Sequence, residues 1–261
     1  MSDAVREVSG EQGSDFKGYD FGWSRIAYAI PWLVAAALLA AAVVFQLKWP
    51  ALWGAWFVLA VLAINSFAGG LLLRTSDRAD HAPLPFVDLL ASDGDRVLDA
   101  GCGAGRTTLA LSKVLKKGTI TAFDRFDAGY IDGGGRALLD RNLRIAGLTG
   151  RVEIVKGDLT RLPFPDAHFD SAVSAHVIDH LGPHKQAALA ELRRVLKPGA
   201  RLLMVVWVPG WASFAMGSAF SFLLTSKPRW RALAAAAGFR IRDEGHFDGL
   251  WFALLERSAL S

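Results

Sequence analysis

Three glycines at alternate positions, Gly101, Gly103 and Gly105, follow an apolar run that contains Asp99. Glycine lets the backbone turn sharply and lets a ligand approach it closely. The spacing differs from the G-x-G-x-x-G of dinucleotide-binding turns, and no Gly-Lys-Ser/Thr follows as in a P-loop. The pattern predicts a strand-to-helix turn that binds a ligand through its backbone. A tight connection without a ligand is the alternative.

Two further acids follow β-rich runs downstream. Asp124 ends the run TITAFD, where a carboxylate can accept hydrogen bonds from both hydroxyls of a ribose. Asp158 follows the next run, in Gly157-Asp158-Leu159, and is placed to accept from an adenine amino group. A helix N-cap is the other interpretation of any single Asp.

Histidines gather after another β-rich run, at His176, His180 and His184, with Asp179 among them. If this stretch is helical, His176 and His180 share a face. One interpretation makes His176 or His180 the base that deprotonates a substrate hydroxyl; the other is a solvated loop with hydrogen-bonding histidines. Because no H-E-x-x-H motif occurs, we expect no metal site.

The elements that must position these residues alternate along residues 76–261. β-rich runs at 96–100, 119–123, 152–156, 169–174 and 201–207 alternate with helical patterns at 109–117, 135–147 and 184–196. Alternation of this kind predicts βαβ units and a mostly parallel sheet. Runs at 239–245 and 249–257 predict a closing hairpin whose last strand is antiparallel. We therefore expect an α/β fold with a doubly wound, seven-stranded sheet.

Four segments together resemble the class I S-adenosylmethionine-dependent methyltransferases. They are VLDAGCGAGR (97–106), TAFD (121–124), GDLTRLPFPDAHFD (157–170) and LRRVLKPGARLL (192–203). The stretch LPFPDAHFD looks most like the ubiquinone/menaquinone-biosynthesis-type branch. The resemblance covers about residues 92–207 and, loosely, the C-terminal hairpin. It implies a Rossmann-like methyltransferase fold and S-adenosylmethionine as cofactor.

The resemblance also implies a role for each matching residue. The methionine part of the cofactor would lie on the backbone of Gly101, Cys102 and Gly103, with Asp99 orienting its ammonium through water. Asp124 would hold the ribose. The remaining implied contacts are Arg125 and Phe126 beside the adenine, Asp158 and Leu159 at its edge and face, and Ser174, Ala175 and His176 at the sulfonium end.

The loop at 126–135 departs from the family's common pattern because it contains Gly133, Gly134 and Gly135. Consecutive glycines predict a mobile or closely packed loop over the cofactor. Tyr130 and Asp132 are candidate substrate contacts, although a plain connector explains them equally simply. The Asn/Asp-Pro-Pro-Tyr/Phe tetrapeptide of amino-methylating enzymes is absent after the fourth strand.

Before this domain lie two uncharged runs, 26–47 and 51–73, which predict a transmembrane hairpin after an N-terminal segment, 1–25. At ~1.5 Å per residue, 22 residues reach ~33 Å, enough for a hydrocarbon core. A buried hairpin of a soluble protein is the alternative. A cleaved signal peptide is not expected, because the first run is too long and acids precede it. Asn65 and Ser66 are expected to hydrogen-bond across the hairpin.

Flanking charge predicts the orientation of this hairpin. Arg25, Arg74 and Arg78 lie outside the turn and Lys48 lies within it, so the positive-inside rule places both termini and the catalytic domain in the cytoplasm. The net charge of +4 is too small to suggest a nucleic-acid partner. The single cysteine, Cys102, excludes an intrachain disulfide, and its place in a glycine turn favours packing over reactivity.

The expected function is methyl transfer from S-adenosylmethionine to a small, lipophilic or membrane-associated acceptor. Two alternatives stay open: a nicotinamide-dependent oxidoreductase on a similar fold, and a non-catalytic membrane scaffold that keeps the cofactor site. The apolar stretch 210–225 is interpreted as core, as a substrate lid, or as a surface resting on the bilayer.

Overall fold

The computed structural model describes residues 18–22, 25–77, 88–129, 131–211, 213–214, 218–247 and 250–258. The chain divides into two compact units. The first, called here the sheet unit, holds the described residues of 1–22, 80–208 and 225–261. The second, called the hairpin unit, holds those of 23–79 and 209–224. This grouping differs from the predicted limits, because 18–22 joins the sheet unit and 209–224 joins the hairpin unit.

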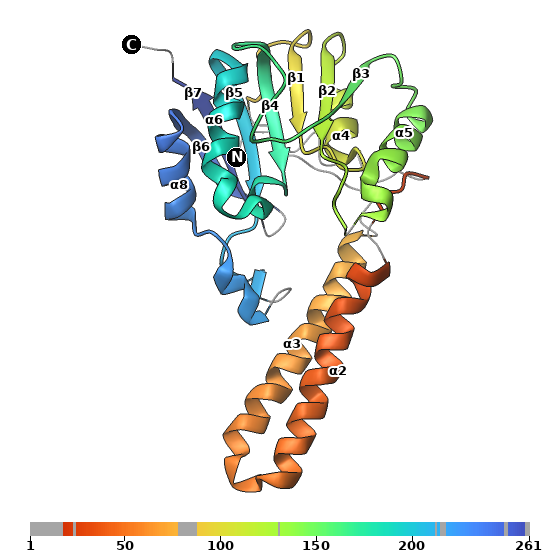
Figure 1. Ribbon diagram of the computed structural model, residues 1–261, viewed down its shortest axis with the longest axis vertical. Helices are drawn as coiled ribbons and strands as arrows, with labels where there is room; N and C mark the ends of the chain where they lie inside the picture. Colours follow the sequence, from red (N-terminus) through yellow and green to blue (C-terminus); the bar gives the residue numbers. More distant parts are fainter. Residues whose placement is uncertain are drawn as a thin grey trace. The chain divides into compact units, whose positions relative to one another are not determined.

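The sheet unit is built on a seven-stranded sheet with the order β3-β2-β1-β4-β5-β7-β6 (Figure 1). Strands β1 to β5 pair in parallel, and β7 pairs antiparallel with both β5 and β6. The predicted α/β fold class and the antiparallel last strand are therefore confirmed. The strands are β1 (Arg96–Ala100), β2 (Thr119–Asp124), β3 (Val152–Lys156), β4 (Phe169–Ala175), β5 (Leu196–Val206), β6 (Phe239–Phe247) and β7 (Leu250–Arg257).

Helices cover the two faces of this sheet and form two separate apolar cores. Side chains of α4 (Arg106–Val114) and α5 (Arg136–Ile145) pack with one core, which includes Leu109 and Leu139. Side chains of α6 (Lys185–Val195) and α8 (Lys227–Ala236) pack with the other, which includes Leu192 and Trp230. Helices on both faces of a mostly parallel sheet define the doubly wound arrangement.

Two predicted boundaries are wrong, and one helix was missed. Helix α4 begins at Arg106, not residue 109, because Gly105 adopts φ +90° and starts the helix directly after the glycine turn. Strand β5 begins at Leu196, not residue 201, and its register against β4 shifts between Leu196 and Arg201. Helix α8 was not predicted at all. Its residues 232–236 are mostly alanine, which gives little amphipathic pattern.

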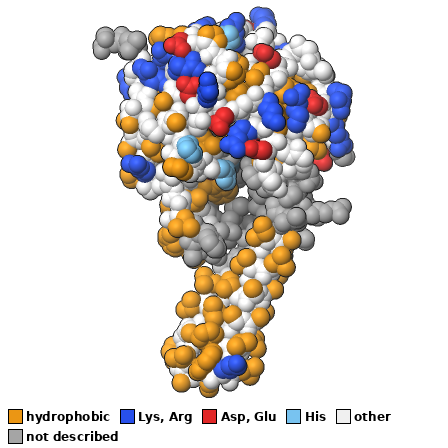
Figure 2. Space-filling model, viewed as in Figure 1, with side chains coloured by type: hydrophobic (Ala, Val, Ile, Leu, Met, Phe, Trp, Pro, Cys, Tyr) orange, Lys and Arg blue, Asp and Glu red, His pale blue; other side chains and the backbone are white. Residues whose placement is uncertain are grey.

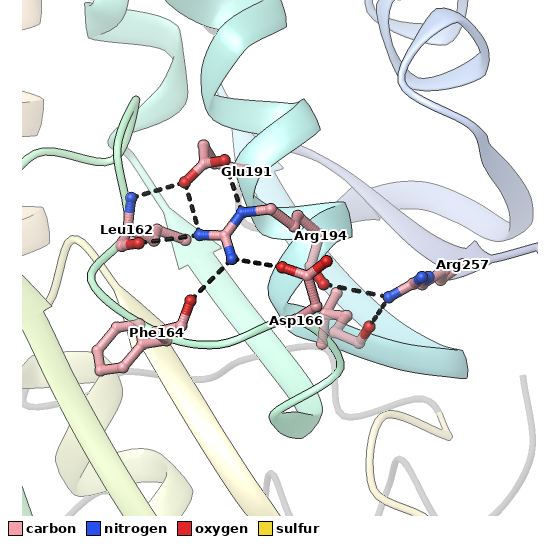
Figure 3. Close-up of polar contacts among 7 residues, drawn as sticks. Leu162, Phe164, Asp166, Glu191, Arg194 and Arg257 are labelled. Carbon is pink, nitrogen blue, oxygen red and sulfur yellow. Dashed lines mark hydrogen bonds and ion pairs between the residues drawn. The ribbon is translucent and has the colours of Figure 1, made fainter.

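One arginine holds the loop between β3 and β4 (Figure 3). Arg194 of α6 donates to the carbonyl oxygens of Leu162 and Phe164 at 2.9 and 2.8 Å, and to Asp166 Oδ1 at 2.8 Å. Its Nε and Nη2 also donate to the two carboxylate oxygens of Glu191, and Glu191 Oε2 accepts from the N–H of Leu162. These hydrogen bonds from Arg194 lower the pKa of Glu191. Side chains of α6 thus hold residues 162–166 of the stretch 157–170 through a network of hydrogen bonds.

Residues 18–22 are bound to the sheet unit through a fully buried side chain. Asn142 of α5 donates from Nδ2 to the carbonyl oxygen of Asp20 at 2.7 Å and to that of Ala104 at 2.9 Å. Its Oδ1 accepts from the N–H of Asp20 at 3.1 Å. Arg141 lies 3.8 Å from Asp20, and Tyr19 and Phe21 pack against the adjacent core. We call this segment the strap; one amide ties it to the glycine turn.

The hairpin unit pairs α2 (Arg25–Lys48) with α3 (Trp53–Asp77), joined through Trp49 and the 3-10 turn η2 (Pro50–Leu52). The 3-10 helix η5 (Ser218–Leu223) also belongs to it. Ala29–Lys48 and Pro50–Leu71 are long and apolar enough to cross a membrane, with mean hydropathies of 2.2 and 1.8. These helices reproduce the predicted runs to within a few residues.

Packing within this hairpin is the reverse of that in a soluble core. The buried residues between the helices are small: Ala35, Ala42, Ala63, Ser66, Gly69 and Gly70. Large side chains such as Leu33, Leu47 and Ile64 are at least two-thirds exposed. Apolar side chains accordingly cover the surface of the hairpin (Figure 2). Small residues at the interface and large ones outside are typical of helices that pack in lipid.

Ser66 makes the hydrogen bond expected across the hairpin. Its Oγ donates to the carbonyl oxygen of Pro31 at 2.9 Å. The rings of Trp32 and Phe67 meet edge to face nearby, with centroids 4.6 Å apart. A Cβ added to Gly70 would lie 3.0 Å from the indole of Trp32, so the two helices approach closely at this level.

We predict that Arg194→Met loosens the loop between β3 and β4 and lowers the free energy of unfolding by about 2–4 kcal/mol, because two carbonyl and two carboxylate partners lose a charged donor. Arg194→Lys should recover only part of this, since one ammonium cannot reproduce the planar guanidinium. Hydrogen exchange of the Leu162 amide should accelerate in both variants. Arg144→Met, at an exposed position of α5, is the matched control; equal exchange in the Arg194 and Arg144 variants would contradict the prediction.

Candidate active site

The glycine turn after β1 is closed by the end of β2. The N–H groups of Gly101 and Cys102 both donate to the carbonyl oxygen of Phe123, at 2.7 and 3.1 Å. The N–H of Gly103 donates to Asp124 Oδ2 at 2.9 Å. The three N–H groups are therefore engaged within the protein, and the carbonyl oxygen of Cys102 accepts from the N–H of Gly105 at 2.7 Å. A ligand contact with this backbone stays a prediction.

Glycine at position 101 is required by packing as well as by backbone conformation. Gly101 has φ +91°, and a Cβ built there would lie 2.2 Å from Val177. Gly103 has φ +50°, and a Cβ there would meet only Ile131, at 3.3 Å. A side chain at 101 would therefore displace the segment after β4, whereas one at 103 would extend beside the turn.

Asp124 joins the end of β2 to two turns at once. Its Oδ2 accepts from Gly103, and its Oδ1 accepts from the N–H of Phe126 at 2.7 Å. The side chain is half-buried. Each carboxylate oxygen can accept a second hydrogen bond. Asp124 can therefore hold the glycine turn and still offer acceptors to a ligand.

Asp99 is buried beneath the glycine turn with one oxygen unpaired. It is 1% exposed, and Thr108 Oγ1 of α4 donates to its Oδ2 at 2.5 Å. Its Oδ1 has no hydrogen-bond partner among the described residues. Burial raises the pKa of this carboxyl to about 7, and the charge of Asp124 adds to the rise. Thr108 carried no signal in the sequence, because a threonine in a helical pattern is commonplace.

Asp158 lies beyond the end of β3 and is about half exposed. Its Oδ1 accepts from the backbone N–H and the hydroxyl of Thr160 at 2.8 and 2.7 Å, which lowers the pKa of the carboxyl. Its Oδ2 lies 3.7 Å from Arg125, whose guanidinium donates mainly to Asp127. Leu159, by contrast, is 5% exposed and belongs to the core, so it offers little surface to an adenine ring.

The loop at 126–135 is closely packed where it is described. Gly134 and Gly135 have φ +71° and +92°; a Cβ on Gly134 would lie 2.0 Å from the carbonyl oxygen of Phe126, and one on Gly135 3.0 Å from Gly103. Of the two predicted roles for these glycines, close packing is confirmed for this pair. Phe126, half-buried, has the guanidinium of Arg136 5.6 Å from its ring centroid. Tyr130 and the side chain of Asp132 lie outside the described residues.

The three residues predicted at the sulfonium end, which lie at and just after the end of β4, differ in burial. Ser174 is 1% exposed and its hydroxyl donates to the carbonyl oxygen of Ala100 at 2.9 Å, so it joins β4 to β1 and is not available as a lining residue. Ala175 and His176 are half-buried.

His176 ends this strand in a strained conformation. Its φ is +59°, its N–H donates to the carbonyl oxygen of Val205 at 2.9 Å, and its ring centroid lies 5.9 Å from that of Trp207. Burial lowers the pKa of the imidazole; the carboxylate of Asp179 opposes this, whereas the charges of His180 and Arg106 reinforce it. The imidazole is therefore neutral at pH 7.

His176 and His180 do not share a helical face, so that expectation is wrong. The 3-10 stretch η4 begins only at Ile178, and the positive φ of His176 excludes it from a helix. His180 is exposed. Asp179 accepts from the N–H of Trp207 at 3.3 Å through Oδ2, while its Oδ1 is buried and has no partner among the described residues.

Arg106 is a site residue that sequence reasoning missed. It follows Gly105, influences the pKa of His176, and carries its guanidinium 4.5 Å from the ring centroid of Phe21 in the strap. The strap therefore lies beside the glycine turn and covers a charged side chain of the site. Arg106 is recognised as a site residue through its contact with Phe21, which is far away in the sequence. Within the described part of the chain, no group of three or more His, Cys, Asp or Glu residues has metal-binding geometry.

Comparison with known proteins places this site in context. Residues 98–204 match the model of a methyltransferase-domain family. A 2-phytyl-1,4-naphtoquinone methyltransferase of Synechococcus elongatus is 42% identical over 112 residues, 42% of this chain and 45% of that protein. A ubiquinone/menaquinone biosynthesis C-methyltransferase of Pseudomonas savastanoi is 38% identical over 112 residues, 43% and 41% of the two chains. The matched region thus spans less than half the length of these relatives.

A solved structure extends the likeness beyond the motifs. A SAM-dependent methyltransferase from Aquifex aeolicus superposes with a TM-score of 0.56 at 24% identity, over 65% of this chain and 86% of that one. The predicted Rossmann-like methyltransferase fold is confirmed. The sheet unit therefore has the fold of the S-adenosylmethionine-dependent methyltransferases, and within it residues 98–204 match the methyltransferase-domain family.

Proposed function

We propose that this protein transfers a methyl group from S-adenosylmethionine to a small lipophilic acceptor of the quinone type, at a membrane that its helical hairpin spans. One observation carries the cofactor assignment. Asp99, Asp124 and Asp158 lie at the carboxyl ends of β1, β2 and β3, three neighbours in the sheet, beside the glycine turn. In open α/β sheets, ligands bind at the carboxyl ends of the strands.

The residues present fit this cofactor. The unpaired Oδ1 of buried Asp99 is an acceptor without a donor, which suits the ammonium of the methionine part, directly or through a water. Asp124 has acceptor capacity for ribose hydroxyls beyond the two bonds it makes to the protein. Asp158 Oδ2 is exposed enough to accept from an adenine amino group, beside Arg125 and Phe126. When bound, S-adenosylmethionine supplies an electrophilic methyl group on a sulfonium sulfur.

The chain's own residues would then orient the acceptor and move a proton. His176 is neutral at pH 7 and lies at the end of β4 with Trp207 against its ring, so its free nitrogen can accept a proton from an acceptor hydroxyl. Asp179, with one unpaired oxygen, is near enough to favour the protonated imidazole. His176 would thus act as the base, and the carboxylate of Asp179 would stabilise its protonated form.

The acceptor class rests on the relatives and on the hairpin. The names of the two similar enzymes specify a phytyl-naphthoquinone and ubiquinone/menaquinone biosynthesis. Both imply acceptors with long apolar tails. An enzyme whose own helices have small residues inside and large apolar residues outside would meet such an acceptor in the bilayer.

Chain connectivity supports the proposed orientation, with both termini and the catalytic domain on the cytoplasmic side. The strap precedes α2 and is hydrogen-bonded to Asn142 of the sheet unit. The chain returns to the same unit after α3. A spanning hairpin would thus have both helix ends on the side of the sheet unit and its turn, with Lys48, on the other. S-adenosylmethionine is made in the cytosol, which suits a cytoplasmic sheet unit.

The direct test is incubation of membranes containing the full chain with an isotopically labelled methyl donor and the hydroquinone form of a naphthoquinone or benzoquinone that lacks the ring methyl group, because this form carries the hydroxyl that His176 would deprotonate. We expect label in the quinone. Binding of S-adenosylhomocysteine without any labelled product would favour the scaffold alternative. Binding of a nicotinamide dinucleotide in its place would favour the oxidoreductase.

Asp99 gives cofactor affinity a pH dependence with a definite sign. The carboxyl has a pKa of about 7 in the unliganded protein, whereas an ammonium ligand favours the ionised form. Affinity for S-adenosylhomocysteine should therefore rise from pH 5.5 to 7, approaching tenfold per unit well below pH 7, with proton release on binding. Calorimetry in buffers of different ionisation enthalpy measures that release. The Asp99→Asn variant should bind S-adenosylhomocysteine more weakly and without releasing a proton. If the variant releases as many protons as the parent protein, Asp99 is not the group that contacts the ammonium.

His176→Asn tests the base. Asparagine tolerates positive φ, so the backbone should keep its conformation. We expect kcat to fall by about 10²-fold or more with S-adenosylhomocysteine affinity unchanged. In the parent enzyme, kcat/KM should rise with pH through a pKa below the usual histidine value of about 6.5. His180→Asn is the matched control, and equal losses in the two variants would count against His176 as the base.

Lys48→Cys tests the orientation. The native cysteine, Cys102, is buried, so it gives little background labelling. In intact cells an impermeant thiol reagent should reach the introduced thiol from outside the cytoplasmic membrane. Labelling only after the cytoplasmic membrane is permeabilised would show the reverse topology. Release of the chain from membranes by carbonate would show that the two helices do not span the membrane.

A further inference from the structure

We infer that the described residues of 209–224, namely 209–211, 213, 214 and 218–224, form a second membrane-contacting element, which inserts apolar side chains into the lipid surface beside the hairpin. This inference rests on the membrane anchoring proposed above. Called here the insertion segment, the stretch follows β5 and precedes α8. It carries no charged residue. The structure bears on the three interpretations left open by its sequence: core, lid or bilayer surface.

The described side chains of the insertion segment are too exposed for a core. Trp211 is 84% exposed, Phe222 72% and Leu223 82%. The rings of Phe214 and Phe222 lie 5.9 Å apart, so the exposed aromatic surface is continuous there. Large apolar side chains gathered in this way mark a contact with a partner or a membrane.

The insertion segment belongs with the membrane helices and not with its neighbours in sequence. Strand β5 and helix α8 are in the sheet unit, whereas residues 209–224 group with α2 and α3 in the hairpin unit. Within that unit, η5 contacts α3. The chain thus leaves the sheet unit, joins the two apolar helices and returns. An apolar surface continuous with a lipid-embedded hairpin has lipid as its natural covering.

Charge in the flanking sequence fits an anionic bilayer. Between Glu191 and Asp243 every charged residue is basic. Arg231 pairs with Glu244 and Lys227 lies 2.7 Å from His246, while Arg229 is exposed and has no ion pair among the described residues. Basic side chains next to an uncharged aromatic segment are typical of surfaces that rest on anionic headgroups.

The placement predicts a function for the segment. In a quinone methyltransferase, an acceptor with a long apolar tail must leave the bilayer far enough for its ring to reach the catalytic groups. A lipid-inserted segment that follows β5 in the chain can shelter that tail from water. The insertion segment would therefore lower the KM for a membrane-partitioned acceptor without affecting cofactor binding.

Site-directed spin labels on the full chain, in vesicles of phosphatidylethanolamine and phosphatidylglycerol, test the contact. Labels are placed at Leu223 in the insertion segment, at Ile64 in α3, and at Ile145, a 47%-exposed apolar residue of α5. We expect Leu223 and Ile64 to favour collisions with oxygen, as in lipid, and Ile145 to favour a water-soluble nickel chelate. Preference of Leu223 for the chelate would overturn the inference.

The three positions separate this inference from the proposed function. If Ile64 lies in lipid and Leu223 in water, only the inference fails. If Ile64 also lies in water, the membrane anchor itself fails. Spin–spin broadening at Leu223 would identify a second copy of the chain as the covering partner and would likewise overturn lipid contact.

A kinetic arm tests the consequence. Leu223→Asp should raise the KM for a long-tailed quinone in vesicles by about tenfold, roughly the loss of one buried leucine, and leave S-adenosylhomocysteine affinity unchanged. Its KM for a tail-less quinone in solution should not change. Ile145→Asp is the matched control. An equal rise in KM for both quinones would show that the substitution damages the acceptor site itself and would refute lipid-side sheltering.

Discussion

The carboxylate of Asp124 is the interaction on which the site depends. One side chain at the end of β2 accepts from Gly103 in the turn after β1 and from Phe126 in the turn after β2. The neighbouring carbonyl of Phe123 accepts from Gly101 and Cys102. Because β1 and β2 pair in parallel, the turns that follow them lie side by side. These turns cannot move apart without leaving backbone N–H donors unpaired. The protein's own groups thus hold the turns after β1 and β2 together.

Around this interaction, residues of the family-like motifs divide between binding and support. In the stretch 157–170, Asp158 faces outward, whereas the carbonyls of Leu162 and Phe164 are held by Arg194. Asp170, in the same stretch, accepts from the N–H of Arg96 and from Lys197, which joins β4 to the starts of β1 and β5. Much of this motif therefore keeps the loop in place.

The strap, which precedes α2 in the chain, is held beside the glycine turn within the sheet unit. It is bound by Asn142, whose amide also holds the carbonyl of Ala104 in the glycine turn. Phe21 of the strap lies over Arg106, one residue past that turn. The segment that leads toward α2 is therefore part of the packing around the glycine turn.

The sequence alone determined the sheet, the glycine turn, the three strand-end acids and the two apolar helices, because strand alternation, glycine spacing and long uncharged runs are local signals. Tertiary structure decided the rest. Ser174 and Leu159 fall inside the core, Thr108 and Asn142 become partners of the site, and His176 leaves the helix it was expected to share with His180. These outcomes depend on contacts between segments far apart in the chain. A single sequence records which residues are present but not which ones meet, and hydrogen bonds such as Asn142 to Asp20 have no periodicity by which to find them.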